Sequence, residues 1–156
     1  MPARPNFDLQ TAHKYFSATC FNQTWDYINK TERSAQEDDE MLASAFASLW
    51  HWMQREDRKP ENLPIGYWQV SRVYALLGQA DNARRFGQRS LELAQADGAE
   101  PVFVGFAYEA LARAESIAGN QGKASEYLQA ARRLAEQVSD AEDRQLLEKD
   151  LDALTV

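Results

Sequence analysis

The sequence has very few of the residues that build disulfides, metal sites and nucleophilic centres. It contains one cysteine, Cys20, and only two histidines, His13 and His51. A single cysteine cannot form an internal disulfide, which is typical of proteins from a reducing compartment. Neither histidine lies in a spacing such as H-E-x-x-H, which would place two metal ligands on one face of a helix. We therefore expect no metal centre and no cofactor.

Glycine and proline are also scarce, with 7 and 5 residues respectively. There is no glycine-rich phosphate-binding loop, and no stretch has the alternating pattern of a β-strand. Long uninterrupted segments remain, and they are filled by alanine, leucine, glutamine, glutamate and arginine, which are good helix formers. This pattern predicts an all-α protein.

Positive charge and long apolar runs are lacking as well. The formal net charge is −7, and no basic face is evident, so we expect no nucleic-acid partner. The apolar runs are only a few residues long, far too short to span a membrane, and Met1–Asn6 lacks the pattern of a signal peptide. We expect a cytoplasmic protein with no membrane partner.

Capping signals predict two helices in the first third of the chain. Asp8 is placed to cap a helix that runs to about Asn29. Ser34 and Glu37 form a capping-box signature at the start of a second helix, which is expected to end near Arg58. These two helices would form one hairpin over residues 8–58.

Glycines and prolines divide the remainder of the chain. Gly78 and Gly119 are placed to end helices in the left-handed conformation that glycine adopts readily. Pro64 and Pro101 suit the first turn of a helix. The expected helices after the first two cover about 63–77, 81–96, 101–118, 121–138 and 140–154, which gives about seven helices in all.

A repeat with a period of 41 residues lies within these helices. Ile65–Ala96 aligns without a gap to Phe106–Gln137. The alignment contains seven identities: Tyr67/Tyr108, Arg72/Arg113, Gly78/Gly119, Ala83/Ala124, Gln88/Gln129, Leu93/Leu134 and Ala94/Ala135. Each copy spans two predicted helices, so the repeating unit is a helical hairpin.

The repeated residues follow a known pattern of aromatic and small side chains. They are Tyr67, Val70, Ser71, Tyr74, Gly78, Ala83 and Ser90 in the first copy, and Tyr108, Leu111, Ala112, Gly119, Ala124, Leu128 and Ala131 in the second. In this pattern the chain resembles the tetratricopeptide repeat (TPR) family. The resemblance implies a single helical repeat domain over residues 1–156, an array of about three antiparallel hairpins: the divergent hairpin at 8–58, repeats at 63–96 and 101–138, and a capping helix at 140–154.

The sequence departs from the family pattern at several positions. Gly87 stands where an aromatic residue is expected, with Phe86 beside it, and Glu115 replaces the second aromatic of the first helix. Neither copy ends in proline, and the period exceeds the usual ~34 residues. More loosely, the order of Trp25-Asp26, His51-Trp52 and the segment 108–114 resembles small uncharacterised bacterial proteins of this type, a likeness that implies no activity.

The family resemblance implies a concave groove lined by the first helix of each hairpin. The candidate groove residues are Trp68 and Arg72 in one copy and Glu109 and Arg113 in the other. The two arginines occupy equivalent positions and could bind carboxylates of an acidic partner. Alternatively, Glu109 neutralises Arg113 four residues along the helix, and Trp68 packs against the second helix of its hairpin.

Three classes of function follow from these observations. The first is a non-catalytic adaptor that binds a protein or peptide partner in the groove. The second is a self-associating structural protein, for which a homodimer is the simplest form. The third is a small-molecule or enzymatic pocket around Trp50, His51 and Trp52. We favour the adaptor and expect no enzymatic activity, because no catalytic motif accompanies the repeat.

Overall fold

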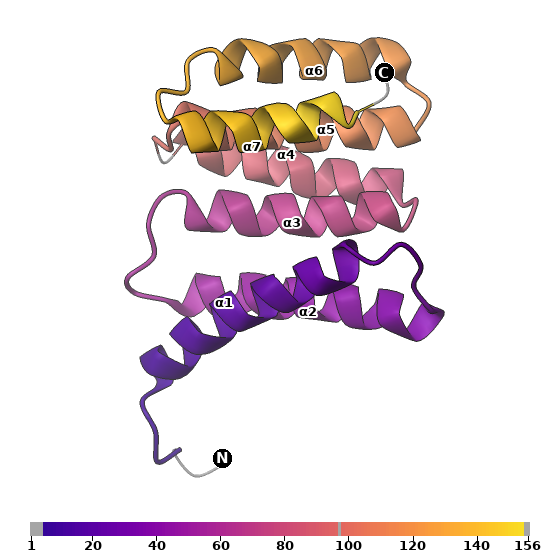
Figure 1. Ribbon diagram of the computed structural model, residues 1–156. Helices are drawn as coiled ribbons and strands as arrows, with labels where there is room; N and C mark the ends of the chain where they lie inside the picture. The colour runs from indigo at the N-terminus through magenta and orange to yellow at the C-terminus, as the bar shows by residue number, and fades with distance from the viewer. Residues whose placement is uncertain (1–4, 97, 155–156) are drawn as a thin grey trace. The chain divides into compact units, whose positions relative to one another are not determined.

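The computed structural model describes residues 5–96 and 98–154, and seven helices make up this part of the chain (Figure 1). The helices are α1 (Leu9–Ile28), α2 (Ala35–Gln54), α3 (Asn62–Leu76), α4 (Ala80–Ala96), α5 (Pro101–Ile117), α6 (Gln121–Ala135) and α7 (Ala141–Asp152). The described residues include no strand, and the predicted all-α class is confirmed. The expectation that Met1–Asn6 is no signal peptide lies largely outside the described residues.

The chain divides into two compact units, Met1–Lys59 and Pro60–Val156. The first unit is a hairpin in which α1 packs along α2. Its interface is formed by small hydroxyl residues: the Oγ1 of Thr24 lies 2.8 Å from the Oγ of Ser44, and Ser48 donates a 2.8 Å hydrogen bond to the carbonyl of Ser17. Small side chains let the two helix backbones approach closely, and the hydrogen bonds satisfy the buried hydroxyl groups.

The caps of both helices in this hairpin are the predicted ones. The carboxylate of Asp8 accepts a hydrogen bond from the backbone N–H of Thr11 at 2.7 Å. Ser34 and Glu37 form a complete capping box at the start of α2. Each cap satisfies a backbone N–H that the helix itself cannot pair.

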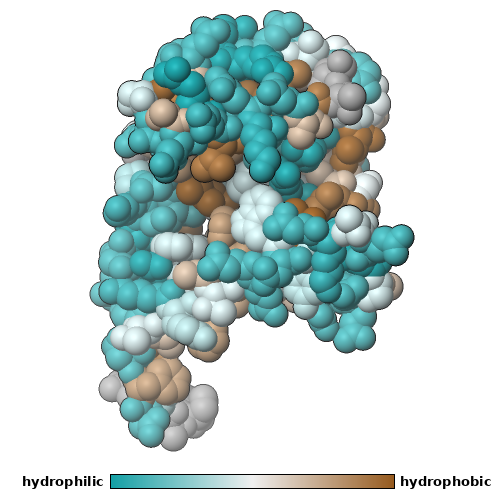
Figure 2. Space-filling view, viewed as in Figure 1, coloured by the Kyte–Doolittle hydropathy of each residue, from teal (hydrophilic) through white to brown (hydrophobic). Residues whose placement is uncertain are grey.

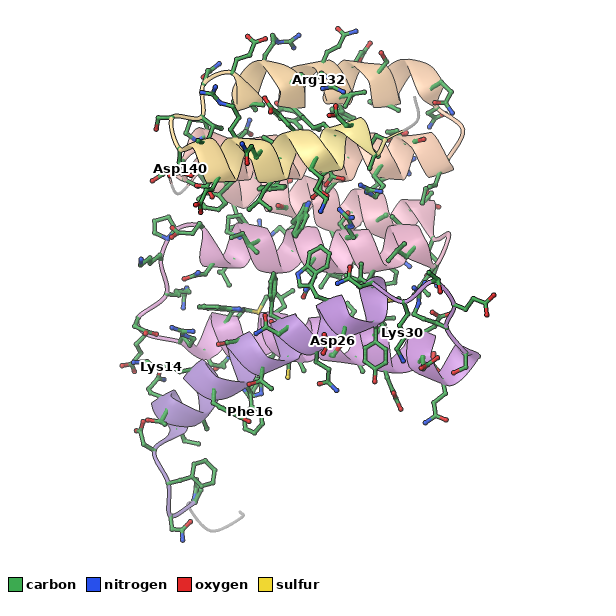
Figure 3. The ribbon with its side chains drawn as sticks, viewed as in Figure 1. Lys14, Phe16, Asp26, Lys30, Arg132 and Asp140 are labelled. Carbon is green, nitrogen blue, oxygen red and sulfur yellow. The ribbon has the colours of Figure 1, made fainter. Side chains whose placement is uncertain are left out.

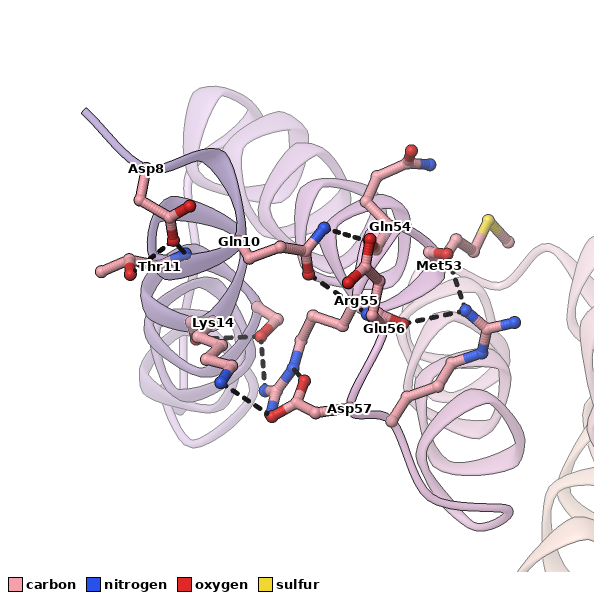
Figure 4. Close-up of polar contacts among 11 residues, drawn as sticks. Asp8, Gln10, Thr11, Lys14, Met53, Gln54, Arg55, Glu56 and Asp57 are labelled. Carbon is pink, nitrogen blue, oxygen red and sulfur yellow. Dashed lines mark hydrogen bonds and ion pairs between the residues drawn. The ribbon is translucent and has the colours of Figure 1, made fainter. Parts of the chain in front are cut away.

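The end of α2 differs from the sequence prediction. The helix ends at Gln54, not near Arg58, because Arg55 adopts an extended conformation. The guanidinium of Arg58 then donates to the free carbonyls of Met53 and Arg55, both at 3.0 Å. Figure 4 shows these contacts beside those of Gln10, whose amide bonds the carbonyl of Gln54 across the hairpin. Side chains therefore complete the helix end that the backbone leaves open.

The second unit holds both copies of the repeat, as the hairpins α3–α4 and α5–α6. Small residues lie where the helices cross. Ser71 donates a 2.7 Å hydrogen bond to the carbonyl of Ala83, and a Cβ added at Gly87 would lie 3.3 Å from Leu111 and from the Ser71 hydroxyl. The glycine that departs from the family pattern at position 87 is thus explained by close packing of α4 against α3 and α5.

The turns within the repeats follow the sequence prediction closely. Gly78 and Gly119 have φ values of +71° and +81°, the left-handed conformation expected at these helix ends. Towards the C-terminus the helices are shorter than predicted: α6 ends at Ala135 and α7 at Asp152. After α6, the N–H groups of Gln137 and Val138 donate to the carbonyls of Leu134 and Ala135, three residues earlier. The guanidinium of Arg144 donates to the carbonyl of Val138, which fixes the turn into α7.

Helix α7 packs against α5 and α6. Its Leu147 and Leu151 are fully buried in a core cluster with residues of α5 and α6. Arg132 on α6, labelled in Figure 3, forms an ion pair with Asp152 at 3.0 Å. The apolar surface of the second repeat is therefore covered by α7, as a terminal helix of a repeat array must do.

Hydrophilic residues cover most of the face of the molecule shown in Figure 2. The helices within residues 5–96 and 98–154 include none with the length and apolar character needed to cross a membrane.

Candidate functional site

The second unit contains a buried polar cluster centred on Glu109 of α5. The side chain of Glu109 is fully buried, with 0% exposure. Its Oε2 accepts a 2.7 Å hydrogen bond from the indole Nε1 of Trp68, on α3. Its Oε1 accepts two hydrogen bonds from Arg113, at 2.9 Å from Nε and 2.5 Å from Nη2. A buried carboxylate needs such charged and polar partners to offset its loss of hydration.

Arg72 connects this cluster to the terminal helix. Its Nη1 lies 3.8 Å from the Glu109 carboxylate and 3.2 Å from Oδ2 of Asp150, on α7. Its guanidinium also lies over the ring of Trp68, 5.9 Å from the centroid. The four groove residues predicted from the sequence, Trp68, Arg72, Glu109 and Arg113, are thus brought together on α3 and α5.

The charges in this cluster balance. Two arginines, Arg72 and Arg113, face two carboxylates, Glu109 and Asp150. The side chains of Arg72 and Arg113 are 16% and 18% exposed, and that of Asp150 is 20% exposed. Glu109 is therefore the buried anchor, while the two guanidinium groups and Asp150 reach the edge of the cluster.

A second buried glutamate, Glu115, lies near the other end of α5. It accepts hydrogen bonds from Arg84 on α4, at 2.6 and 3.2 Å, and from the amide of Asn120 at 2.7 Å. The Arg84 guanidinium is the main reason that the pKa of the Glu115 carboxyl lies below its ordinary value, since burial acts in the opposite direction. Arg84 also pairs with the exposed Asp81 at 2.7 Å.

The pairing of Arg84 with Glu115 was not predicted from the sequence. The two residues are 31 positions apart and do not occupy equivalent places in the repeat, so no periodicity connects them. The one available signal was that Glu115 stands at an apolar position of the family pattern, where an ionised side chain requires a partner from a neighbouring helix.

His51 and Trp52, the candidate pocket residues, have different surroundings within the first unit. The Nδ1 of His51 lies 2.8 Å from the Nδ1 of His13, and the ring of Phe16, labelled in Figure 3, packs at 5.3 Å. Burial and, second, the neighbouring His13 lower the pKa of His51. Trp52 instead lies under the guanidinium of Arg55, at 4.0 Å from the ring centroid.

Cys20 is half-buried, and burial raises the pKa of its thiol. A raised pKa disfavours the reactive thiolate form. In the described segments, no group of three or more histidine, cysteine, aspartate or glutamate side chains is arranged to hold a metal ion.

The fold and the cluster define an α-helical repeat protein whose repeats are joined by buried polar contacts. Residues 64–137 match the family described as "Tetratricopeptide repeat", a span that covers both α3–α4 and α5–α6. This part of the chain is therefore TPR-like, as its repeated residues predicted. No curated protein and no solved structure matches it. Helical repeats of this kind are interaction scaffolds, which present extended surfaces to other proteins.

Proposed function

We propose that this protein is a non-catalytic, cytoplasmic adaptor that binds a protein or peptide partner on the face of α3 and α5. The match to an interaction-scaffold family supports this function, as does the equivalent placement of Arg72 and Arg113 in the two repeats. Two guanidinium groups at the same repeat position favour a ligand with acidic side chains.

The observation that carries the proposal is the pair between Arg72 and Asp150. The Asp150 carboxylate lies 3.2 Å from Nη1 of Arg72 and is itself partly exposed. It occupies the place that a carboxylate of a partner would take. Glu109 stays buried and holds both arginines in position, so an incoming carboxylate would replace Asp150 while the cluster remains neutral.

The proposed binding of a carboxylate requires the planar guanidinium groups and not only their positive charge. Lysine keeps the charge that Glu109 needs but loses the paired donors that grip a carboxylate. The double variant Arg72→Lys/Arg113→Lys therefore separates partner binding from folding better than a charge reversal would.

The test is quantitative affinity capture from the native cytosol followed by mass spectrometry. We expect the double lysine variant to capture at least about tenfold less of the principal partner than the wild type does. This decrease corresponds to about 1.4 kcal/mol of binding free energy. Arg133→Lys, at an exposed position of α6, is the matched control and should bind normally. An unchanged set and amount of captured proteins with the folded double variant would refute the proposed face.

A further inference from the structure

A cleft of about 550 Å³ lies between α4 and α6, on side chains that the Glu109 cluster does not use. Its lining residues are Asp81, Arg84, Arg85, Gln88, Glu115, Asn120, Lys123 and Tyr127. A second depression of about 410 Å³ shares Arg85 and Gln88 with it and extends to Tyr67 on α3. We call this continuous surface the α4–α6 cleft.

Cations on this surface outnumber its carboxylates. Arg84, Arg85, Arg89 and Lys123 face three acids, Asp81, Glu92 and Glu115. All three carboxylates already form ion pairs within the chain. Arg84 pairs with both Asp81 and Glu115, and Arg89 pairs with Glu92 at 3.2 Å.

Arg85 and Lys123 are exposed, and neither forms an ion pair within the described residues. Arg85 is placed by Phe86, whose ring centroid lies 5.7 Å from its guanidinium carbon. Two cations of the α4–α6 cleft are therefore available to an external anion.

Aromatic rings form the floor beside these cations. Tyr67 stacks on Phe86 with centroids 6.0 Å apart and planes at 25°, and the guanidinium of Arg89 lies over Tyr67. Tyr127 lines the other end and packs against Tyr108, with centroids 6.0 Å apart. Rings that are already stacked lose little conformational freedom when a ligand covers them, which makes them suitable contact surfaces.

We propose that the α4–α6 cleft is a second binding site, which takes a short acidic segment of a partner protein. Carboxylates of the segment bind Arg85 and Lys123, and its apolar side chains lie on Tyr67, Phe86 and Tyr127. The whole chain carries a net charge of −7, which repels a long polyanion such as a nucleic acid. A short segment experiences mainly the local cations, since charges beyond a Debye length are screened at physiological salt.

The site is independent of the proposed α3–α5 face, because it shares none of Trp68, Arg72, Glu109 and Arg113. A protein with both sites could hold two segments of one partner, and the second binding event would then occur at a high effective concentration.

The test uses the full chain and a fluorescein-labelled short peptide of alternating glutamate and alanine with a central tyrosine. We expect saturable binding by fluorescence anisotropy, and weakening by at least about tenfold in Arg85→Glu/Lys123→Glu. The control Arg133→Glu/Lys149→Glu makes the same change in net charge at exposed positions outside the cleft and should bind within about twofold of the wild type. Backbone amide shifts in the wild type should concentrate on α4 and the start of α6.

Several outcomes would overturn the second site. These are no saturation up to about 1 mM peptide, equal binding of a glutamine-for-glutamate peptide, or equal loss of binding in both double variants. Binding of a short single-stranded DNA or of inorganic phosphate as tight as that of the peptide would assign the cleft to a different ligand. Amide shifts confined to α3 and α5 would place the peptide on the other face, and Arg72→Lys/Arg113→Lys tests that face separately.

Discussion

The indole Nε1 of Trp68 donates a 2.7 Å hydrogen bond to Oε2 of Glu109, and the two residues are 41 positions apart. This separation equals the period of the repeat, so one position of the repeat holds a donor in the first copy and its acceptor in the second. The contact joins α3 to α5 through a buried charge, where an ordinary repeat interface would be apolar.

Removing the Glu109 carboxylate should be strongly destabilising. Glu109→Ala leaves Arg113 and the Trp68 indole without their buried acceptor and opens a cavity at a fully buried position. Loss of one partner of a buried ion pair typically costs about 3–5 kcal/mol. Urea unfolding followed by circular dichroism should show a decrease of this size in the free energy of unfolding.

Two further variants make this measurement specific. Glu109→Gln keeps an acceptor for Trp68 but removes the charge, so it should cost less than the alanine variant. Glu126→Ala, on the exposed surface of α6, should change stability by no more than about 0.5 kcal/mol. Equal stability of Glu109→Ala and Glu126→Ala would show that the cluster does not hold the repeats together.

Gly105 should be intolerant of alanine because α7 packs directly on it. A Cβ at this position would lie 2.5 Å from Cδ2 of Leu147, which is fully buried. Overpacking of this kind typically costs about 1–3 kcal/mol. We expect faster amide hydrogen exchange in α7 of Gly105→Ala, because the Leu147 side chain must leave its buried position and loosen the packing of α7.

Gly122→Ala is the natural control for that substitution. It lies on α6, and a Cβ there would meet no atom within 4 Å. Alanine within a helix is favoured over glycine by about 0.5–1 kcal/mol, so this variant should be slightly stabilised. Similar effects of the two substitutions on stability and on hydrogen exchange would contradict the close packing of α7 on Gly105.

The stability of the first unit should decrease in mild acid. Burial and His13 lower the pKa of His51 below its ordinary value of 6.5. Just below pH 6.5 the unfolded chain therefore binds more protons at His51 than the folded chain does, and the free energy of unfolding falls as the pH falls. Urea unfolding at about pH 7.5 and about pH 5.5 should show a lower midpoint in acid.

His51→Asn removes the titrating group and is the comparison for this effect. In this variant, the urea midpoints measured at the two pH values should differ by less than they do in the wild type. Contacts with Thr11 lower the pKa of Asp8, and contacts with Lys30 and the Ser34 backbone lower that of Glu37. Both carboxyl groups therefore titrate below this pH range and do not contribute to the difference. A pH dependence that is identical in the variant would exclude His51 as its source.

Features set by local sequence were predicted well. Asp8, Ser34 and Glu37 cap their helices, and Gly78 and Gly119 close theirs, because caps and turns depend on residues within one helical turn. The repeat was found from its period of 41 residues, and the family was suggested by the resemblance of its aromatic and small residues to the TPR pattern. The end of α2 was placed four residues too late because Arg58 caps it through side-chain contacts that no local pattern reveals.

Contacts between distant helices could be predicted only where the repeat connects them. Trp68, Arg72, Glu109 and Arg113 were grouped because they share two repeat positions. The direct bond from Trp68 to Glu109 and the contact of Asp150 with Arg72 were not predicted. His13 and His51 likewise meet through packing of α1 on α2, which their spacing in the sequence does not encode.

The central claim is that the α3–α5 face binds a partner carboxylate in the place now held by Asp150, and Asp150→Asn tests it most directly. This variant leaves Glu109 and both arginines intact and removes only the competing charge. In quantitative capture from the native cytosol, we expect several-fold more of the principal partner on Asp150→Asn than on the wild type, and less on Arg72→Lys/Arg113→Lys. Equal capture by Asp150→Asn and the wild type would contradict it.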